Sequence, residues 1–380
     1  MPELRHHLSR RRDNDDEGVS EMEKKFMKGN EALAEAAVRA GMRFFAGYPI
    51  TPQNEIPEYL SWRLPQVGGV FVQGESEIAS INMVYGAAST GTRAMTSSSG
   101  PGISLKTEGI SYLSAARLPA LIVDVSRGGP GLGSIQPAQS DYLQATKALG
   151  HGGHRLIVFA PNSVQEIVDL TYNAFDYAER DRNPVMILID GVLGAMMESV
   201  ELPEMKEPNP QSQSSWSLGR WEGDKRKAHI ISPIYEAGLE GLNRSFGERT
   251  ERWKENDVKV EELYLDDAEY VITSYGISSR VCRQVVENLR KKGYSVGMIR
   301  PITLFPFPEK SFESLDEKKV KAVISVEMSI PGQMAEDVRA SIKGKIPVFE
   351  YGHSGGILLD DFDVKNAVTK IINSIEEGEQ

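Results

Sequence analysis

The 380-residue chain contains a single cysteine, Cys282, and no apolar run that reaches the roughly 18 residues of a membrane-spanning helix. One thiol excludes a disulfide framework within the chain. It also excludes an iron–sulfur cluster held by this chain alone, because such clusters typically use four thiolates. We interpret Cys282 as a small buried side chain in a helix that follows Gly276. If electrons leave the protein through iron–sulfur centres, another chain must carry those centres.

A surplus of positive charge is also absent. The net charge of -11 argues against a nucleic-acid-binding surface, which needs basic residues to neutralise phosphates. With 40% hydrophobic and 26% charged residues, the composition is typical of a globular cytoplasmic enzyme subunit. No P-loop, zinc motif or Ser–His–Asp constellation is present. We expect no metal site: His6 and His7 form a pair in a segment that we expect to be mobile, and His151 and His154 have no third ligand at suitable spacing.

The hydrophobic pattern divides the chain into four parts. Residues 1–26 mix both signs of charge without an apolar period, and we interpret them as a disordered tail. Over 27–200, nearly continuous apolar strands alternate with helices, which is typical of a parallel sheet covered on both faces. Residues 201–267 are rich in Pro, Ser and charge and predict a connecting excursion. A second, smaller α/β unit follows over 268–380.

Four loops of the first unit are expected at the carboxyl ends of its strands, where ligands of parallel α/β sheets bind. Their sequences are GYPITP at 47–52, ESE at 75–77, SSSGPG at 97–102 and RGGPGLG at 127–133. The small residues of the third loop open a helix, and a helix N-terminus attracts anions. The glycine spacing of the fourth loop is close to a dinucleotide fingerprint. Pro130 interrupts it and no crossover helix follows, so we expect no nicotinamide cofactor.

Three side chains in these loops could act in catalysis or binding, and each could instead have a purely structural role. Glu77 stands between a buried strand and an apolar helix, where a desolvated carboxyl can hold or share a proton. It can equally serve only to complement the helix dipole. Arg127 follows a strand and precedes glycines, so its guanidinium can fork onto a carboxylate or form a structural salt bridge. Thr51, between two prolines, is either a lone hydroxyl donor or part of a rigid turn.

Taken together, the four loops resemble the first domain of the 2-oxoacid:ferredoxin oxidoreductases, and the resemblance extends over residues 27–375. A second set of motifs is similar to the transketolase C-terminal-like domain of that family. The segments that carry the resemblance are Gly47–Pro52 (YPITP), Glu75–Asn82 (the helix-opening acidic motif), Ser97–Gly102 (SSGPG), Arg127–Gly133 (RGGPG), Arg300–Pro308 (RPITLFPFP) and Val326–Met334 (VEMSIPGQM).

The resemblance implies a thiamine diphosphate-binding-type sheet domain followed by a transketolase C-terminal-like domain. Glu77 matches the family's glutamate at N1′ of the aminopyrimidine, and Thr51 and Arg127 match positions that hold the substrate's oxygens. The other implied residues are Tyr48, Pro49, Ile50, Ser99, Gly100 and Pro101 for the cofactor and Gly128 and Leu132 for the substrate pocket. One departure is Ser329, where relatives often carry asparagine.

The resemblance also implies partners, because the family's diphosphate and magnesium site lies on a beta-type subunit. A gamma-type subunit, iron–sulfur clusters on partner chains, ferredoxin and CoA complete the expected system. Within the family, GGPGLGSIQPAQSD looks most like the branched-chain type, which acts on 3-methyl-2-oxobutanoate, and Leu132 and Ile135 would give an apolar lining. The alternatives are a 2-oxoglutarate-type subunit, a non-catalytic scaffold subunit, and a thiamine-dependent enzyme that passes acyl groups to lipoamide.

Overall fold

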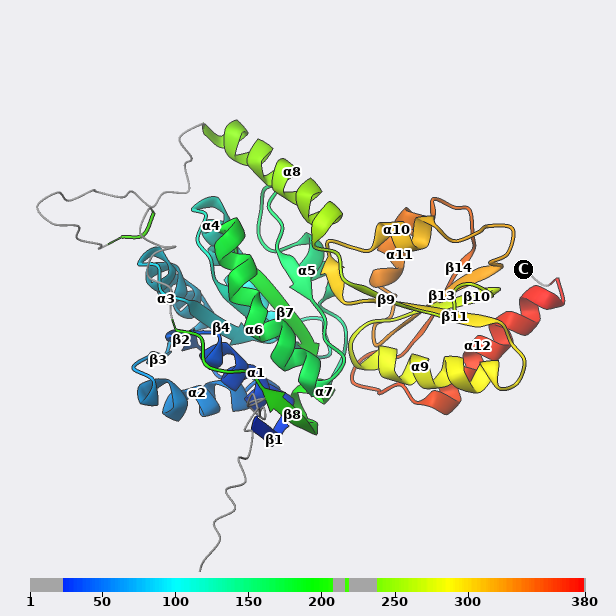
Figure 1. Cartoon of the computed structure of the whole chain (residues 1–380), viewed down its shortest axis with the longest axis horizontal. Helices are drawn as coiled ribbons and strands as arrows, with labels where there is room; N and C mark the ends of the chain where they lie inside the picture. The colour runs from blue at the N-terminus through cyan, green and yellow to red at the C-terminus, as the bar shows by residue number, and fades with distance from the viewer. Residues whose placement is uncertain (1–22, 208–215, 219–237, 379–380) are drawn as a thin grey trace, which may run out of the picture.

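The computed structural model of the chain describes residues 23–207, 216–218 and 238–378. Figure 1 shows two α/β units side by side, the first in blue to green and the second in yellow to red. The larger unit lies at the N-terminal side and the smaller one at the C-terminal side. Within these residues, no helix is both long and apolar enough to cross a membrane.

The first unit is built on a seven-stranded sheet with the order β12-β6-β7-β5-β4-β2-β3. Every pairing is parallel except that of β12 with β6. Helix α1 packs on α2 and α6, and α3 packs on α4. The elements are α1 (Gly29–Arg39), β2 (Phe44–Gly47), α2 (Glu55–Gln66), β3 (Val70–Gln73), α3 (Glu77–Ser89), β4 (Ala94–Ser98), α4 (Gly100–Ala115), β5 (Leu121–Ser126), α5 (Tyr142–Lys147), β6 (Ile157–Phe159), α6 (Val164–Asp181), β7 (Val185–Asp190) and α7 (Gly191–Ala195).

The apolar strands explain why this sheet is central. All residues of β4, β5 and β7 are buried, as a parallel strand requires when helices cover both of its faces. The sequence pattern predicted this α/β arrangement, and the structure confirms the fold class.

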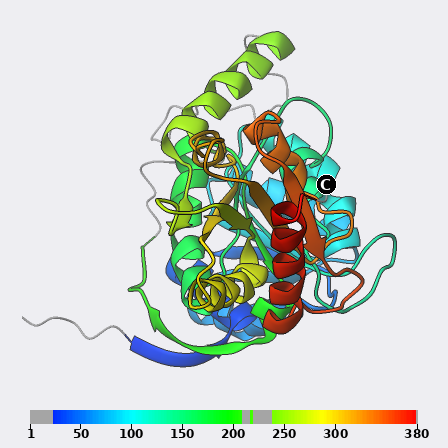
Figure 2. The ribbon, with the colours of Figure 1, turned by 90° about the vertical axis from the view of Figure 1, so that its right-hand side faces the viewer.

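The second unit contains a five-stranded sheet with the order β14-β13-β10-β11-β9. Helices α9 and α12 pack together on one side of it, and α10 and α11 on the other (Figure 2). Cys282 is fully buried in α9, as predicted, and burial raises the pKa of its thiol to about 12. The elements are β10 (Tyr270–Thr273), α9 (Gly276–Arg290), β11 (Val296–Pro301), α10 (Glu309–Glu313), β13 (Ala322–Glu327), α11 (Met334–Ile342), β14 (Val348–Gly352) and α12 (Asp361–Glu376).

The two units share strands and core. β9 (Val260–Leu263), from the segment interpreted as an excursion, pairs antiparallel with β11 at the edge of the second sheet. In the other direction, β12 (Thr303–Phe305) joins the first sheet beside β6. Each edge gains backbone partners that it otherwise lacks. The largest apolar core runs from the first sheet into the second unit, where it includes Val323 and Met334.

The N-terminal boundary differs from the prediction. The expected tail over 1–26 is too long by its last residues, because β1 (Glu23–Lys28) begins at Glu23 and pairs antiparallel with β8 (Met197–Leu202). Met27 packs with Val200 and Leu202 in a small apolar cluster, and this burial stabilises a segment whose sequence is mostly charged. The rest of the predicted tail, residues 1–22, lies outside the described residues.

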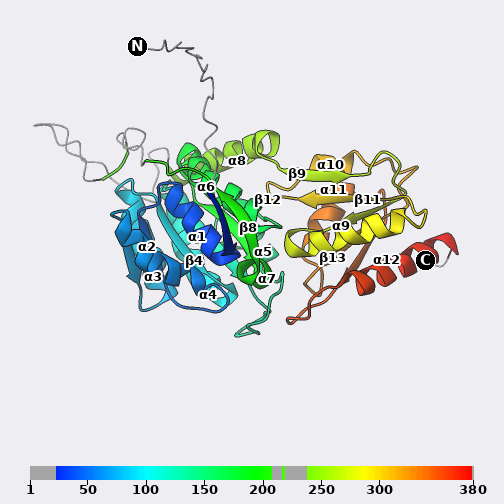
Figure 3. The same cartoon turned by 60° about the horizontal axis from the view of Figure 1, so that its bottom comes forward.

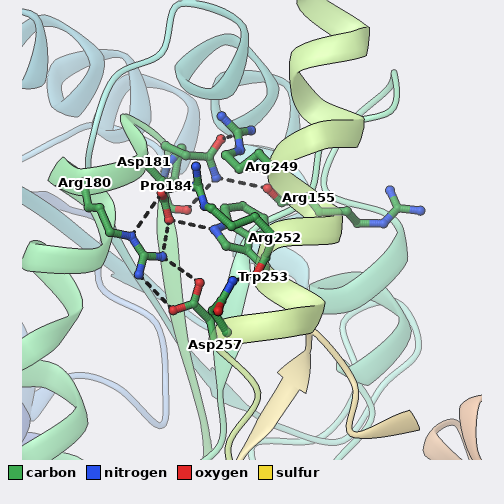
Figure 4. Close-up of polar contacts among 10 residues, drawn as sticks. Arg155, Arg180, Asp181, Pro184, Arg249, Arg252, Trp253 and Asp257 are labelled. Carbon is green, nitrogen blue, oxygen red and sulfur yellow. Dashed lines mark hydrogen bonds and ion pairs between the residues drawn. The ribbon is translucent and has the colours of Figure 1, made fainter. Parts of the chain in front are cut away.

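Helix α8 (Gly238–Asn256) is anchored to the first unit at its C-terminal end (Figure 4). Trp253 is almost completely buried, and its indole Nε1 donates to Asp181 Oδ2 at 2.7 Å. Arg180 bridges Asp181 and Asp257 with ion pairs of 2.6 and 2.8 Å. Arg249, also buried, donates to Asn183 Oδ1 at 2.8 Å.

Trp253→Ala should lower the stability of the chain by about 3–5 kcal/mol, the usual effect of truncating a buried aromatic side chain. Thermal unfolding of the purified protein measures this. Trp62→Ala is the matched control, because Trp62 is 51% exposed. Equal shifts in the midpoints of the two variants would contradict the anchoring role of Trp253.

Candidate active site

The four loops singled out in the sequence follow four adjacent strands. β5, β4, β2 and β3 are neighbours in that order, so Arg127, Ser99, Tyr48 and Glu75 all lie at one edge of the sheet. The chain leaves β2 on one side to form β3 and returns on the other to form β4. This reversal of strand order is where ligands bind in open α/β sheets.

Glu77 is the first residue of α3, and its side chain is buried, with 7% exposed. Ser76 caps the helix by accepting from the backbone amide of Ala79 at 3.1 Å. The carboxyl lies against Gly102 of α4: a Cβ at that position would be 2.7 Å from Glu77 Oε1 and 2.1 Å from Ser98 Oγ. Gly102 is therefore required for the space that the carboxyl occupies.

Arg127 closes the other side of this edge. Its side chain is 6% exposed, and the guanidinium donates to the backbone oxygens of Thr51 at 3.0 Å and Leu132 at 2.8 Å. Its Nε is buried and has no hydrogen-bond partner among the described residues. One cation thus ties the loop after β2 to the loop after β5, with one N–H free to donate.

The start of α4 carries unsatisfied polar groups. Ser99 is the N-cap residue, and Gly100 has a φ of 30°, a value that favours glycine. The hydroxyls of Ser98 and Ser99 are buried without a hydrogen-bond partner among the described residues. Buried hydroxyls are normally paired, so this position is suited to a ligand.

The remaining predicted residues lie at the outer rim. Tyr48, Pro49 and Thr51 are exposed, and Ile50 is half-buried. Gln53, a residue the sequence did not indicate, holds this loop: it donates to the Tyr48 carbonyl at 3.2 Å and accepts from Ser97.

A cavity of about 540 Å³ opens beside Arg127, between the two units. Of the predicted residues, Gly100, Pro101, Arg127 and Gly128 line it. Glu77, Tyr48, Pro49, Ile50, Thr51, Ser99 and Leu132 do not, and Leu132 is 85% exposed. The second unit contributes Met328, Ser329, Ile330, Gln333, Ser354 and Gly355. Figure 3 shows the loop after β5 reaching the segment that precedes α12.

Buried polar side chains hold the second unit's loop in place, and sequence reasoning missed them. Glu327 accepts from the backbone amides of Gln333, Met334 and Ala335 at 2.8–3.0 Å. The side chain of Gln139 accepts a hydrogen bond from the backbone amide of Met328 and donates one to the Tyr275 carbonyl, so it joins both units. The signals in the sequence were the polar run QPAQSD after the glycine-rich loop, which contains Gln139, and the segment VEMSIPGQM, which contains Glu327.

Two buried carboxyls lie behind the cavity. Asp141 lines it, and Asp124 on β5 pairs in register with Ser98 on β4. Burial raises the pKa of Asp124 well above its usual range, and the charge of Asp141 raises it further. Burial also raises the pKa of Asp141. Burial thus opposes the ionisation of both carboxyls, and the charge of Arg127 favours ionisation of Asp141.

The cavity beside Arg127 is not lined by His151, His154 or His353. His151 and His154 line a separate cavity of about 260 Å³ beneath α8, and burial lowers the pKa of His154. His353 stacks edge-on against Tyr351. Across the parts of the chain that the structure describes, no group of three or more His, Cys, Asp or Glu side chains could hold a metal ion.

Comparison with known proteins decides the family. The thiamine diphosphate-binding domain of the pyruvate flavodoxin/ferredoxin oxidoreductases matches residues 35–253, and core domain II of pyruvate:ferredoxin oxidoreductase matches residues 268–364. The chain belongs to the 2-oxoacid:ferredoxin oxidoreductases. Within this family it is an oxidoreductase subunit, and its first unit carries the thiamine diphosphate-binding domain.

Relatives of the oxidoreductase subunit cover nearly its whole length. It is 48% identical over 351 residues to the ketoisovalerate oxidoreductase subunit VorB of Methanothermobacter thermautotrophicus, which is 92% of this chain and 98% of that protein. It is 37% identical over 370 residues to the 2-oxoglutarate synthase subunit KorA of Methanocaldococcus jannaschii, covering 91% and 100% of the two chains.

A solved relative confirms the arrangement of both units. The 2-oxoglutarate:ferredoxin oxidoreductase of Magnetococcus marinus, with 2-oxoglutarate, coenzyme A and succinyl-CoA bound, is 27% identical with a TM-score of 0.82. The match covers 91% of this chain and 65% of that one, so the oxidoreductase subunit spans about two thirds of it. A split-gene transketolase, 15% identical with a TM-score of 0.57, shares the fold.

Proposed function

We propose that this chain supplies the aminopyrimidine side of a shared thiamine diphosphate site in a cytoplasmic complex that oxidises branched-chain 2-oxo acids, such as 3-methyl-2-oxobutanoate. One 2-oxo acid and CoA give acyl-CoA and CO2, and two electrons pass to ferredoxin one at a time. The observation that carries the proposal is the buried carboxyl of Glu77 at the strand-order reversal, at the same edge of the sheet as Arg127.

The residues at this edge fit the cofactor. Glu77 is buried beside Gly102, where a carboxyl can hold a proton at the ring nitrogen N1′ of an aminopyrimidine. The unpartnered hydroxyls of Ser98 and Ser99 supply further polar contacts. Bound thiamine diphosphate supplies the nucleophilic carbon and the electron sink for decarboxylation.

Arg127 is proposed as the clamp for the substrate's carboxylate. Its Nε is buried and unpartnered, and its two terminal nitrogens already fix the flanking loops, so the side chain is preorganised. Thr51 on the adjoining loop is the proposed partner of the 2-oxo group, with Gly128 and Leu132 flanking it.

The charges in the cavity favour a monocarboxylate. Among the described residues that line it, Arg127 is the only cation, and Met328, Ile330, Pro101 and Pro130 provide apolar surface. A second carboxylate on the substrate, as in 2-oxoglutarate, would find no cation there and would lie near Asp141. Desolvating it without a partner is unfavourable. The similarity to ketoisovalerate oxidoreductase subunits supports the same substrate class.

Partner subunits complete the site in this proposal. A beta-type subunit would hold the diphosphate and Mg²⁺, and a gamma-type subunit would assist. The single cysteine of the chain leaves iron–sulfur clusters to a ferredoxin-like subunit or free ferredoxin. The helices flanking Glu77 expose Ile78, Leu105 and Tyr112 by 45–52%, which gives an apolar face for the beta-type subunit.

The test is an anoxic purification of the tagged chain with the subunits that accompany it, followed by CoA-dependent viologen reduction with a panel of 2-oxo acids. We expect kcat/KM for 3-methyl-2-oxobutanoate to exceed that for 2-oxoglutarate and pyruvate by about tenfold or more. Preference for 2-oxoglutarate would overturn the substrate class. No reduction of viologen, by a complex that contains thiamine diphosphate and iron, would overturn the function.

A further inference from the structure

Lys106 is completely buried in α4, one helical turn after Gly102. Its ammonium Nζ donates to Thr96 Oγ1 at 2.7 Å and to the Ser97 carbonyl at 2.9 Å, both on β4. Lysine is rarely buried in this way, because removing an ammonium from water is unfavourable unless it is compensated. The two oxygens that accept these hydrogen bonds are neutral, so they offset only part of the cost of removing the ammonium from water. The burial of Lys106 therefore suggests a role beyond these two bonds.

Carboxyl groups on two neighbouring elements interact electrostatically with Lys106. Glu77 on α3 and Asp124 on β5 both favour its charged form, and Asp141 in turn interacts with Asp124. Burial outweighs them and lowers the pKa of Lys106 to about 7. Gly102, which the Glu77 carboxyl contacts, and Lys106 are four residues apart and so lie on the same face of α4.

We infer that Lys106 is a positioning residue for Glu77. Its ammonium attracts the Glu77 carboxylate electrostatically, and its two hydrogen bonds hold the end of β4 that leads into Ser98 and Ser99. The inference rests on the function proposed above, in which Glu77 meets the aminopyrimidine. A carboxylate at that ring nitrogen must keep its negative charge while the ring holds the proton, and a buried cation nearby stabilises this distribution.

The protonation of Lys106 determines how the affinity for thiamine diphosphate changes with pH. Below its pKa, Lys106 is charged and attracts the Glu77 carboxylate. As the pH rises through about 7, Lys106 loses its proton and this support disappears. When the pH is raised through about 7, the affinity for thiamine diphosphate should therefore fall by about tenfold. A factor of ten in affinity has the same free energy as a shift of one pKa unit.

Lys106→Met tests the inference in the purified complex, with the dissociation constant of thiamine diphosphate measured by titration calorimetry on both sides of pH 7. The variant should bind thiamine diphosphate as weakly below pH 7 as the unmodified complex does above pH 7. Its affinity should not show the step, that is, the fall in affinity as the pH rises through about 7. Replacing a buried charge by an apolar side chain of similar length is often neutral for stability, so the unfolding midpoint should not fall. A lower midpoint with the pH step retained would overturn the inference.

Thr96→Val provides a second test that leaves the lysine in place. Removing a hydrogen bond from the charged form lowers the pKa of Lys106, so the step in affinity should move to lower pH. Thr171→Val is the matched control, since Thr171 is equally buried but lies on α6. A step that stays in place in Thr96→Val, or moves equally in Thr171→Val, would contradict the inference. Normal turnover in Glu77→Gln would instead overturn the proposed function on which it rests.

Discussion

Glu77→Gln should reduce CoA-dependent viologen reduction by the complex by about 100-fold or more, the usual range for losing a proton-transferring side chain. Glutamine has nearly the same shape as glutamate, and the space beside Gly102 and Ser98 that Glu77 occupies stays filled. The amide cannot carry the negative charge that a protonated ring nitrogen requires. The chain should therefore fold and assemble normally while its turnover is lost.

The measurement compares kcat, the content of copurified subunits and the unfolding midpoint in the variant and the unmodified complex. Glu75→Gln is the matched control, because Glu75 is two residues away and exposed. It should keep nearly full turnover. If Glu77→Gln were as active as the control, the chain would act as a scaffold subunit, and the catalytic reading of Glu77 would be wrong.

Arg127→Lys is the second change for which a large effect is expected. Lysine keeps the charge but offers a point donor in place of the planar guanidinium, which here contacts two loops and leaves Nε free. We expect kcat/KM for the 2-oxo acid to fall by about 30-fold or more, in keeping with the loss of a buried hydrogen-bonded charge contact. Both KM and kcat should change, because the arginine also positions the loops.

Steady-state kinetics over the 2-oxo acid concentration, at saturating CoA, measure this effect. Arg280→Lys is the control, since Arg280 is an exposed residue of α9 in an ion pair of 2.7 Å with Glu198 and does not line the cavity beside Arg127. An unchanged kcat/KM in Arg127→Lys would show that the substrate carboxylate is held elsewhere. The role of Arg127 would then be confined to tying Thr51 to Leu132.

Much of the fold could be predicted from local patterns. Apolar strands that alternate with helices indicated a parallel α/β sheet, because strand burial on both faces removes the alternation of polar residues. The helix that starts near Glu77 and the helix that the small residues of Ser97–Gly102 open were also predicted, because both starts depend on neighbouring residues. Family motifs then gave the cofactor, and the comparisons confirm the family and the thiamine diphosphate-binding domain.

The exchange of edge strands could not be predicted. β9 lies in a polar segment, and its four residues become a strand only because the edge of β11 offers backbone partners. β12 is three residues of a proline-rich turn that joins the opposite sheet. Residues 23–26 likewise read as a charged tail, and pairing with β8 makes them a strand. In each case the hydrogen bonds come from a distant part of the chain.

The sequence by itself determined the α/β class, the four loops and the identity of Glu77, Arg127 and Thr51 as candidates, since these depend on neighbouring residues and on motifs. Only the tertiary structure decided which loops meet, that Gln139 joins the two units while Glu327 fixes the loop before α11, and that Lys106 is fully buried in α4. Strand order, cavities and buried charges arise from contacts between residues far apart in the chain, and no local pattern encodes those contacts.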